Sequence, residues 1–132
     1  MQNKFMKLLM ICLGLLLVLS ACAGLQQQVP VGSVEGAKTI TMEADSFKFT
    51  PNNIKASQGD ELTIKITNVA DAGHDFTIKD PKGQIIKSVD LPSKQSVEIR
   101  INLSEAGQYD FYCDKPFHSS FGMKGQIEVV KK

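Results

Sequence analysis

Apolar and polar residues alternate without a break in Val97-Glu98-Ile99-Arg100-Ile101-Asn102-Leu103. Residues 62–67 repeat this pattern, and shorter alternating runs lie nearer the N-terminus. A period of two with one apolar face is typical of a half-buried antiparallel strand. The pattern predicts a chain built from strands, which we place at residues 39–42, 47–49, 62–67, 74–78, 97–103, 108–112 and 125–130.

Turn-forming residues separate these runs. Gly and Pro recur between them, and short strands with turns at roughly ten-residue spacing are typical of a β-sandwich or barrel. No helical period of useful length follows Lys38, so we expect an all-β fold with one short turn or helix at most, at residues 68–73. The apolar faces predict a core of Ile40, Met42, Phe49, Ile54, Leu62, Ile64, Ile66, Phe76, Ile78, Val97, Ile99, Ile101, Tyr109, Phe111, Ile127 and Val129.

The N-terminus reads as a targeting segment. Lys4 and Lys7 precede an apolar run at residues 8–19, which is too short to span a bilayer. Small residues and then Cys22 follow, an order that is typical of a secretory signal and resembles the bacterial lipoprotein box. We expect a signal peptide at 1–21, a lipidated Cys22 with a flexible tether at 22–37, and one domain at 38–132. The alternative is an ordinary signal peptide in which Cys22 has no role.

This assignment places the domain outside the cytoplasm, anchored by lipid to the extracytoplasmic face of a bacterial membrane. Without Lys4 and Lys7, 13 of the 15 basic residues remain against 14 acidic ones, a net charge of about −1. The absence of a basic stripe argues against a nucleic-acid partner. Cys12 leaves with the leader and Cys22 carries lipid, so Cys113 is the one remaining thiol. In an oxidising compartment such a thiol is expected to be buried or bound.

Four residues form a candidate metal site. Cys113, His118 and Met123 follow one another in a Cys-x4-His-x4-Met loop between two predicted strands, and His74 begins an earlier strand. A thiolate and two imidazoles with a weak axial thioether suit a copper ion that cycles between Cu(II) and Cu(I). Each residue has a simpler interpretation by itself, since Cys and Met are often core residues and a single His is often a surface residue. Together they use both histidines and the one remaining thiol, which favours a copper site.

The same loop carries a family resemblance. Residues 107–118, with Gly122–Gly125 and a closing Ile-Glu-Val, resemble the cupredoxins of the plastocyanin/azurin type, and the loop spacing is most similar to that of auracyanin. Residues 73–76 resemble the family's first-ligand strand. The resemblance implies a Greek-key β-sandwich with copper at one end. It implies His74, Cys113 and His118 as the equatorial ligands. It implies Met123 as the axial ligand.

Two positions depart from the family pattern. Asp75 stands where many members have Asn, whose side chain helps to hold the cysteine loop, and an ionised Asp75 favours Cu(II) and lowers the reduction potential. Phe117 stands where many members have Gly, which alters the exposed edge of His118. Gly73 and Asp75 are expected beside the ligands, with the Gly73 carbonyl near the copper.

The predicted function is electron transfer between membrane-side redox partners, which bind transiently to a monomeric carrier. Pro116, Phe117 and Phe121 surround His118 in the sequence and are expected to form a small apolar docking patch. In the alternative arrangement both Phe side chains point into the core. A second function is copper delivery, storage or detoxification, although only Met42 and Met123 remain after the leader. An enzyme is not expected, because no further histidines are available for a catalytic copper.

Overall fold

The structure is a computed structural model that describes residues 39–132. These residues form nine strands and no helix: β1 (Thr39–Asp45), β2 (Lys48–Thr50), β3 (Asn53–Ser57), β4 (Glu61–Asn68), β5 (His74–Lys79), β6 (Ile85–Leu91), β7 (Ser96–Asn102), β8 (Gly107–Tyr112) and β9 (Lys124–Val130). Within this part of the chain there is accordingly no helix long and apolar enough to cross a bilayer. The predictions for residues 1–38, including the signal peptide and the lipidated Cys22, lie outside the described residues.

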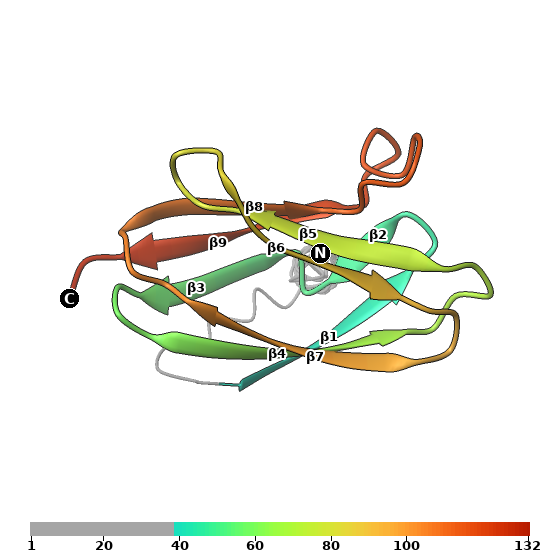
Figure 1. Cartoon of the computed structure of the whole chain (residues 1–132), viewed down its shortest axis with the longest axis horizontal. Helices are drawn as coiled ribbons and strands as arrows, with labels where there is room; N and C mark the ends of the chain where they lie inside the picture. Colours follow the sequence, from blue (N-terminus) through green and yellow to red (C-terminus); the bar gives the residue numbers. More distant parts are fainter. Residues whose placement is uncertain (1–38) are drawn as a thin grey trace, which may run out of the picture.

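The strands pack as a two-sheet sandwich (Figure 1). One sheet has the order β2-β1-β4-β7 and the other β3-β9-β8-β5-β6. The chain crosses between the sheets, which confirms the expected all-β Greek-key sandwich. The prediction of antiparallel strands was wrong for two pairs, since β1 pairs with β4 and β3 pairs with β9 in parallel. Alternation along a strand reports its two faces and carries no information about the direction of its neighbour.

Alternation along β4 shows how the sequence forms this core. Leu62, Ile64 and Ile66 point inward and are almost fully buried, while Glu61 and Lys65 on the other face are exposed. Each such apolar side chain stabilises the fold by about 1.5–3 kcal/mol through removal from water. All sixteen predicted core residues are buried except Val97, which is half-buried and packs against the core. The structure adds Ala44, Ala56, Leu91, Leu103, Cys113 and Met123 to the core cluster.

Two strands were missed by the sequence pattern, and a third was misplaced. β6 is an edge strand whose first six residues are exposed or half-buried. Even Ile85 is 58% exposed, so the strand has no buried apolar face that the sequence pattern could reveal. β3 is short and carries only two buried residues. The strand expected at 47–49 is observed at Lys48–Thr50, and Phe47 lies in the turn before it.

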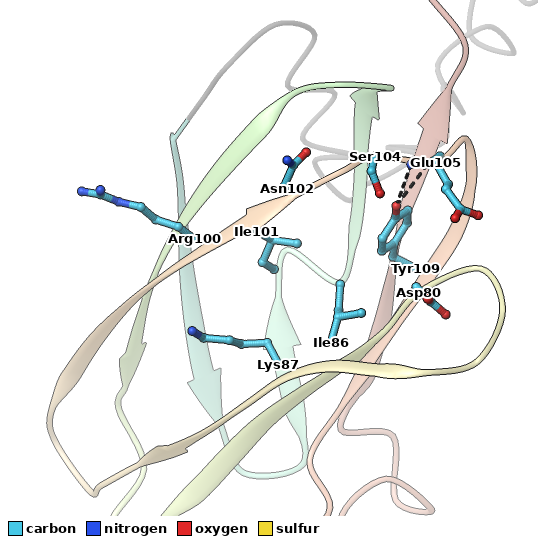
Figure 2. A pocket seen from close by; sticks show the side chains of 9 residues that line it. All are labelled: Asp80, Ile86, Lys87, Arg100, Ile101, Asn102, Ser104, Glu105 and Tyr109. Carbon is cyan, nitrogen blue, oxygen red and sulfur yellow. Dashed lines mark hydrogen bonds between the residues drawn. The ribbon is translucent and has the colours of Figure 1, made fainter.

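A cavity of about 270 Å³ lies between the edge strands β6 and β7 (Figure 2). Tyr109 borders it, and its hydroxyl both donates to the Glu105 carbonyl and accepts from the Glu105 backbone N–H, each at 3.2 Å. These bonds tie the turn before β8 to the strand. None of the candidate metal-site residues lines the cavity.

Gly125, in β9, is expected to tolerate no side chain. A Cβ built there would lie within 3 Å of the Asn52 carbonyl oxygen and of the Phe111 ring. Gly125→Ala should therefore destabilise the copper-free protein by about 1–3 kcal/mol or more, because backbone and a packed ring must move. Urea unfolding measures this change. Gly73→Ala is the matched control, since its nearest neighbour would lie at an ordinary 3.9 Å. Equal unfolding midpoints for the two variants would contradict the prediction.

Candidate metal centre

Three strand ends bring the candidate ligands together. His74 is the first residue of β5, Cys113 directly follows β8, and Met123 directly precedes β9. His118 lies in the loop between β8 and β9, which projects from one end of the sandwich (Figure 1). Because β5 and β8 are paired neighbours in one sheet, their ends at this pole are close in space although far apart in the sequence.

The donor atoms converge on one point. His74 Nδ1 and His118 Nδ1 are 3.1 Å apart, and Cys113 Sγ is 3.4 Å from His118 Nδ1. All three ligand atoms lie within 4.8 Å of one another. His74, Cys113 and Met123 are buried, whereas His118 is half-buried. One small ion fits such a space, with a single edge of the site reaching the surface.

Backbone hydrogen bonds hold the ligand loop. The Cys113 N–H donates to the Met123 carbonyl and the Met123 N–H donates to the His118 carbonyl, each at 3.0 Å. The His118 N–H in turn donates to the Lys115 carbonyl at 3.1 Å. These bonds link all three loop residues through the main chain. The fully buried Met123 side chain is thereby held at the base of the loop.

A buried asparagine holds the segment that leads into His74. The Asn68 side chain donates to the carbonyls of Ala72 and Leu91, each at 2.9 Å, and accepts from the Ala70 N–H at 3.0 Å. A buried amide with its hydrogen bonds made fixes the path of its partners, and leaving such groups unpaired costs about 1–3 kcal/mol. Asn68 therefore anchors residues 70–72, the segment that precedes His74, the first candidate ligand. Sequence reasoning expected only a turn there.

Asp75 fastens the cysteine loop to β5. Its Oδ1 accepts from the Asp114 backbone N–H at 2.7 Å, and its Oδ2 lies 3.5 Å from the Cys113 thiol, which donates to it. Asp75 is almost fully buried. Its side chain thus makes the loop contact that the resemblance attributed to Asn. A carboxylate brings in addition a negative charge beside the sulfur.

Burial changes the pKa values of the two buried candidate ligands, Cys113 and His74. Burial raises the pKa of the Cys113 thiol above its ordinary value, and the neighbouring Asp75 charge also raises it. Burial lowers the pKa of His74, and the positive charges of His118 and Lys115 lower it further. In the copper-free protein these groups therefore favour their neutral forms. Metal binding must displace the thiol proton, so copper affinity is expected to increase with pH.

The lowered pKa of His74 predicts a loss of stability in acid. Below pH ~6.5, the usual pKa of an unfolded histidine, the unfolded chain binds a proton at His74 while the folded chain does not. Falling pH should therefore favour unfolding until the folded-state pKa is reached. Urea unfolding of the copper-free protein at pH 7.5 and pH 5 measures this loss. His74→Gln should narrow the difference between the two midpoints, and an undiminished difference would contradict the prediction.

Aromatic side chains surround the exposed edge of the site. Phe117 and Phe121 are 72% and 67% exposed, and Pro116 is exposed as well. Phe47, from the turn between β1 and β2, packs edge-on against His118 with ring centroids 5.1 Å apart. Such pairs are worth about 0.5–1.5 kcal/mol beyond burial. The alternative in which Phe117 and Phe121 point into the core is wrong.

The structure thus brings together most of the residues singled out in the sequence. His74, Cys113 and His118 meet, and the backbone of Met123 joins theirs. Asp75 contacts Cys113, while Gly73 is exposed directly before His74, and the place of its carbonyl near the copper stays a prediction. Asn68 and Phe47 were missed. The alternation of residues 47–49 had placed Phe47 on a strand face, and nothing local in the sequence indicates its contact with His118.

Comparison with known proteins points in one direction. Residues 9–129 match the family described as Cupredoxin-like domain. The plastocyanin of Dryopteris crassirhizoma is 31% identical over 98 residues, which cover 66% of this chain and 92% of that protein. The chloroplastic plastocyanin of Silene latifolia subsp. alba is 25% identical and covers 88% of this chain and 71% of that protein.

A solved structure agrees in fold. Dithionite-reduced auracyanin from the photosynthetic bacterium Roseiflexus castenholzii superposes with a TM-score of 0.62 at 20% identity. The match covers 70% of this chain and 97% of that one. At this identity the likeness concerns the arrangement of the sandwich.

Proposed function

Because the chain belongs to the cupredoxin-like domain family, we propose that it is a blue-copper electron carrier rather than an enzyme. Its cofactor is one copper ion, and the donor set fits that ion, since a thiolate and two imidazoles are within 4.8 Å of one another. His74, Cys113 and His118 would be the equatorial ligands and Met123 the axial ligand. When bound, copper supplies a one-electron couple between Cu(II) and Cu(I).

The contribution of the protein would be to fix the geometry of the four ligands. Strand ends and backbone hydrogen bonds position the donors, as the Cys113–Met123 and Met123–His118 bonds illustrate. Burial of His74 and Cys113 excludes water from the inner side. A ligand set that barely moves needs little rearrangement when charge changes, which is what rapid electron transfer requires.

His118 is the proposed point of electron exchange. Its ring is the half-buried member of the set and lies between the enclosed donors and the surface. Pro116, Phe117 and Phe121 form the proposed docking patch around it, and their exposure supports that role. Transient redox contacts are small, so a few apolar side chains suffice. We propose redox proteins as the partners and a monomer as the working unit.

We also propose that the domain is exported and attached by lipid at Cys22 to the extracytoplasmic face of a bacterial membrane. The order of charged, apolar and small residues before Cys22 supports this location. The candidate ligands lie far from Cys22 in the sequence. The lipid anchor and the copper site can therefore be tested separately. Mass measurement of membrane-extracted protein would detect the added lipid.

The visible spectrum of the full-length protein with Cu(II) tests the carrier function. An intense blue absorption with one copper per chain and a reversible one-electron wave is the expected result. Copper that binds without the intense band, and passes readily to a chelator without a reversible wave, would overturn the proposal. Delivery or storage of copper would then be the better account.

A further inference from the structure

Phe47 joins a cluster of rings that are far apart in the sequence. Its ring lies 5.1 Å from that of His118 with an interplanar angle of 81°, and 5.2 Å from that of Phe121 at 63°. Both are edge-on arrangements at distances favourable for aromatic pairs. The turn between β1 and β2 therefore contacts the ligand loop directly. Through this turn the first sheet contacts the loop that joins β8 and β9 of the second sheet.

The backbone conformation at position 47 is unfavourable for a phenylalanine. Asp45 pairs with Lys48, so Ser46 and Phe47 form a two-residue turn, and Phe47 has φ 59°. This left-handed conformation suits Gly or Asn and is unfavourable for a bulky side chain. A residue that contradicts its local preference is expected where tertiary contacts or function compensate. Here the compensating contacts are those of its ring with His118 and Phe121.

Apart from Phe47, His118 is restrained by its own loop and through Nδ1, which lies 3.1 Å from His74 Nδ1 and 3.4 Å from Cys113 Sγ. It lies outside any strand, its side chain is half-buried, and its backbone bonds are made within the loop itself. Two rings contact the imidazole: that of Phe47 and that of His74, whose centroid is 5.0 Å away. Of these two, Phe47 is the one that is not a metal donor. It is also 41% exposed, so part of its ring continues the docking patch.

We propose that Phe47 is a positioning residue for His118. Its ring holds the imidazole in the orientation that directs Nδ1 toward Cys113 and His74, and its exposed face extends the docking patch to a second segment of the chain. The second part rests on the proposed electron-carrier function. The first part concerns the protein without copper as well, so the two can fail separately.

Three substitutions in the full-length protein separate positioning from stability. Phe47→Gly removes the ring contacts but also suits the left-handed turn, so its two effects on the melting temperature oppose each other and the net change should be small. The His118 ring should nevertheless become more mobile in the copper-free protein, as measured by NMR relaxation of its ring carbons. Phe47→Tyr, which keeps the ring, should restore the parental behaviour. Ile85→Ala, an exposed apolar change at the edge strand β6, is the control.

Copper retention gives a second measurement. Transfer of Cu(I) to a chelator should be about tenfold faster in Phe47→Gly than in the parent protein, because loss of a residue that orients a ligand typically weakens metal affinity by about 10–100-fold. Phe47→Tyr should transfer at the parental rate. Unchanged His118 mobility in Phe47→Gly would overturn the proposal. So would a lower melting temperature with unchanged copper transfer, since Phe47 would then act only on stability. A protein that shows the mobility change but no reversible redox wave would overturn the carrier function and leave the positioning role intact.

Discussion

Cys113→Ser is expected to abolish the intense visible absorption of the copper-loaded protein completely. The band arises from charge transfer between a thiolate sulfur and Cu(II), and Cys113 is the one cysteine in the described part of the chain. Its sulfur lies 3.4 Å from His118 Nδ1, within the cluster of donors. A serine hydroxyl is a harder and far less acidic donor, so the remaining copper should resemble an ordinary nitrogen–oxygen site. Absorption and electron paramagnetic resonance spectra of the Cu(II) forms measure this change.

Cys22→Ser is the matched control for this experiment. It removes a thiol of the same chain at a position predicted to carry lipid, and it should leave the absorption band intact. Membrane attachment should be lost instead. If the intense band survives in Cys113→Ser, sulfur ligation by Cys113 is wrong. Disappearance of the band in Cys22→Ser would point to that sulfur.

Asp75→Asn is expected to raise the midpoint reduction potential on the order of 100 mV. Asp75 Oδ2 lies 3.5 Å from Cys113 Sγ, and its negative charge stabilises Cu(II) relative to Cu(I). Two unit charges at 4 Å interact by about 4 kcal/mol at an effective dielectric constant of 20, and about 1.4 kcal/mol corresponds to 59 mV for one electron. Partial screening reduces the shift from that limit. Protein-film voltammetry measures the potential.

The asparagine variant isolates charge from structure. Its side-chain oxygen still accepts the bond that the Asp114 N–H donates to Asp75 Oδ1 at 2.7 Å, so the cysteine loop should stay in place. Asp114→Asn is the control, because it removes an exposed carboxylate next to Cys113 in the sequence, where solvent screens its charge. Its shift in reduction potential should be clearly smaller than that of Asp75→Asn. A potential that falls or does not move in Asp75→Asn would contradict the prediction.

Most strands were predictable because a strand in a sandwich has one buried face, which appears in the sequence as alternation of apolar and polar residues. Ile99 and Ile101 alternate with exposed neighbours, and both are buried as expected. β6 was missed for the same physical reason, since an edge strand with an exposed Ile85 lacks that contrast. The parallel pairing of β1 with β4 could not be predicted from the alternation either. Side-chain alternation is identical for parallel and antiparallel neighbours.

The amino-acid order alone determined most of the strands, the donor types and the spacing Cys-x4-His-x4-Met, because these depend on residues close together in the chain. Local sequence could place Cys113 and His118 in one loop, but the arrival of His74 beside them depends on the pairing of β5 with β8. The contact between Phe47 and His118 depends in the same way on where the β1–β2 turn meets that loop. Such contacts join segments that are far apart in the chain, and no local sequence pattern indicates them. They form only when the sheets pack together.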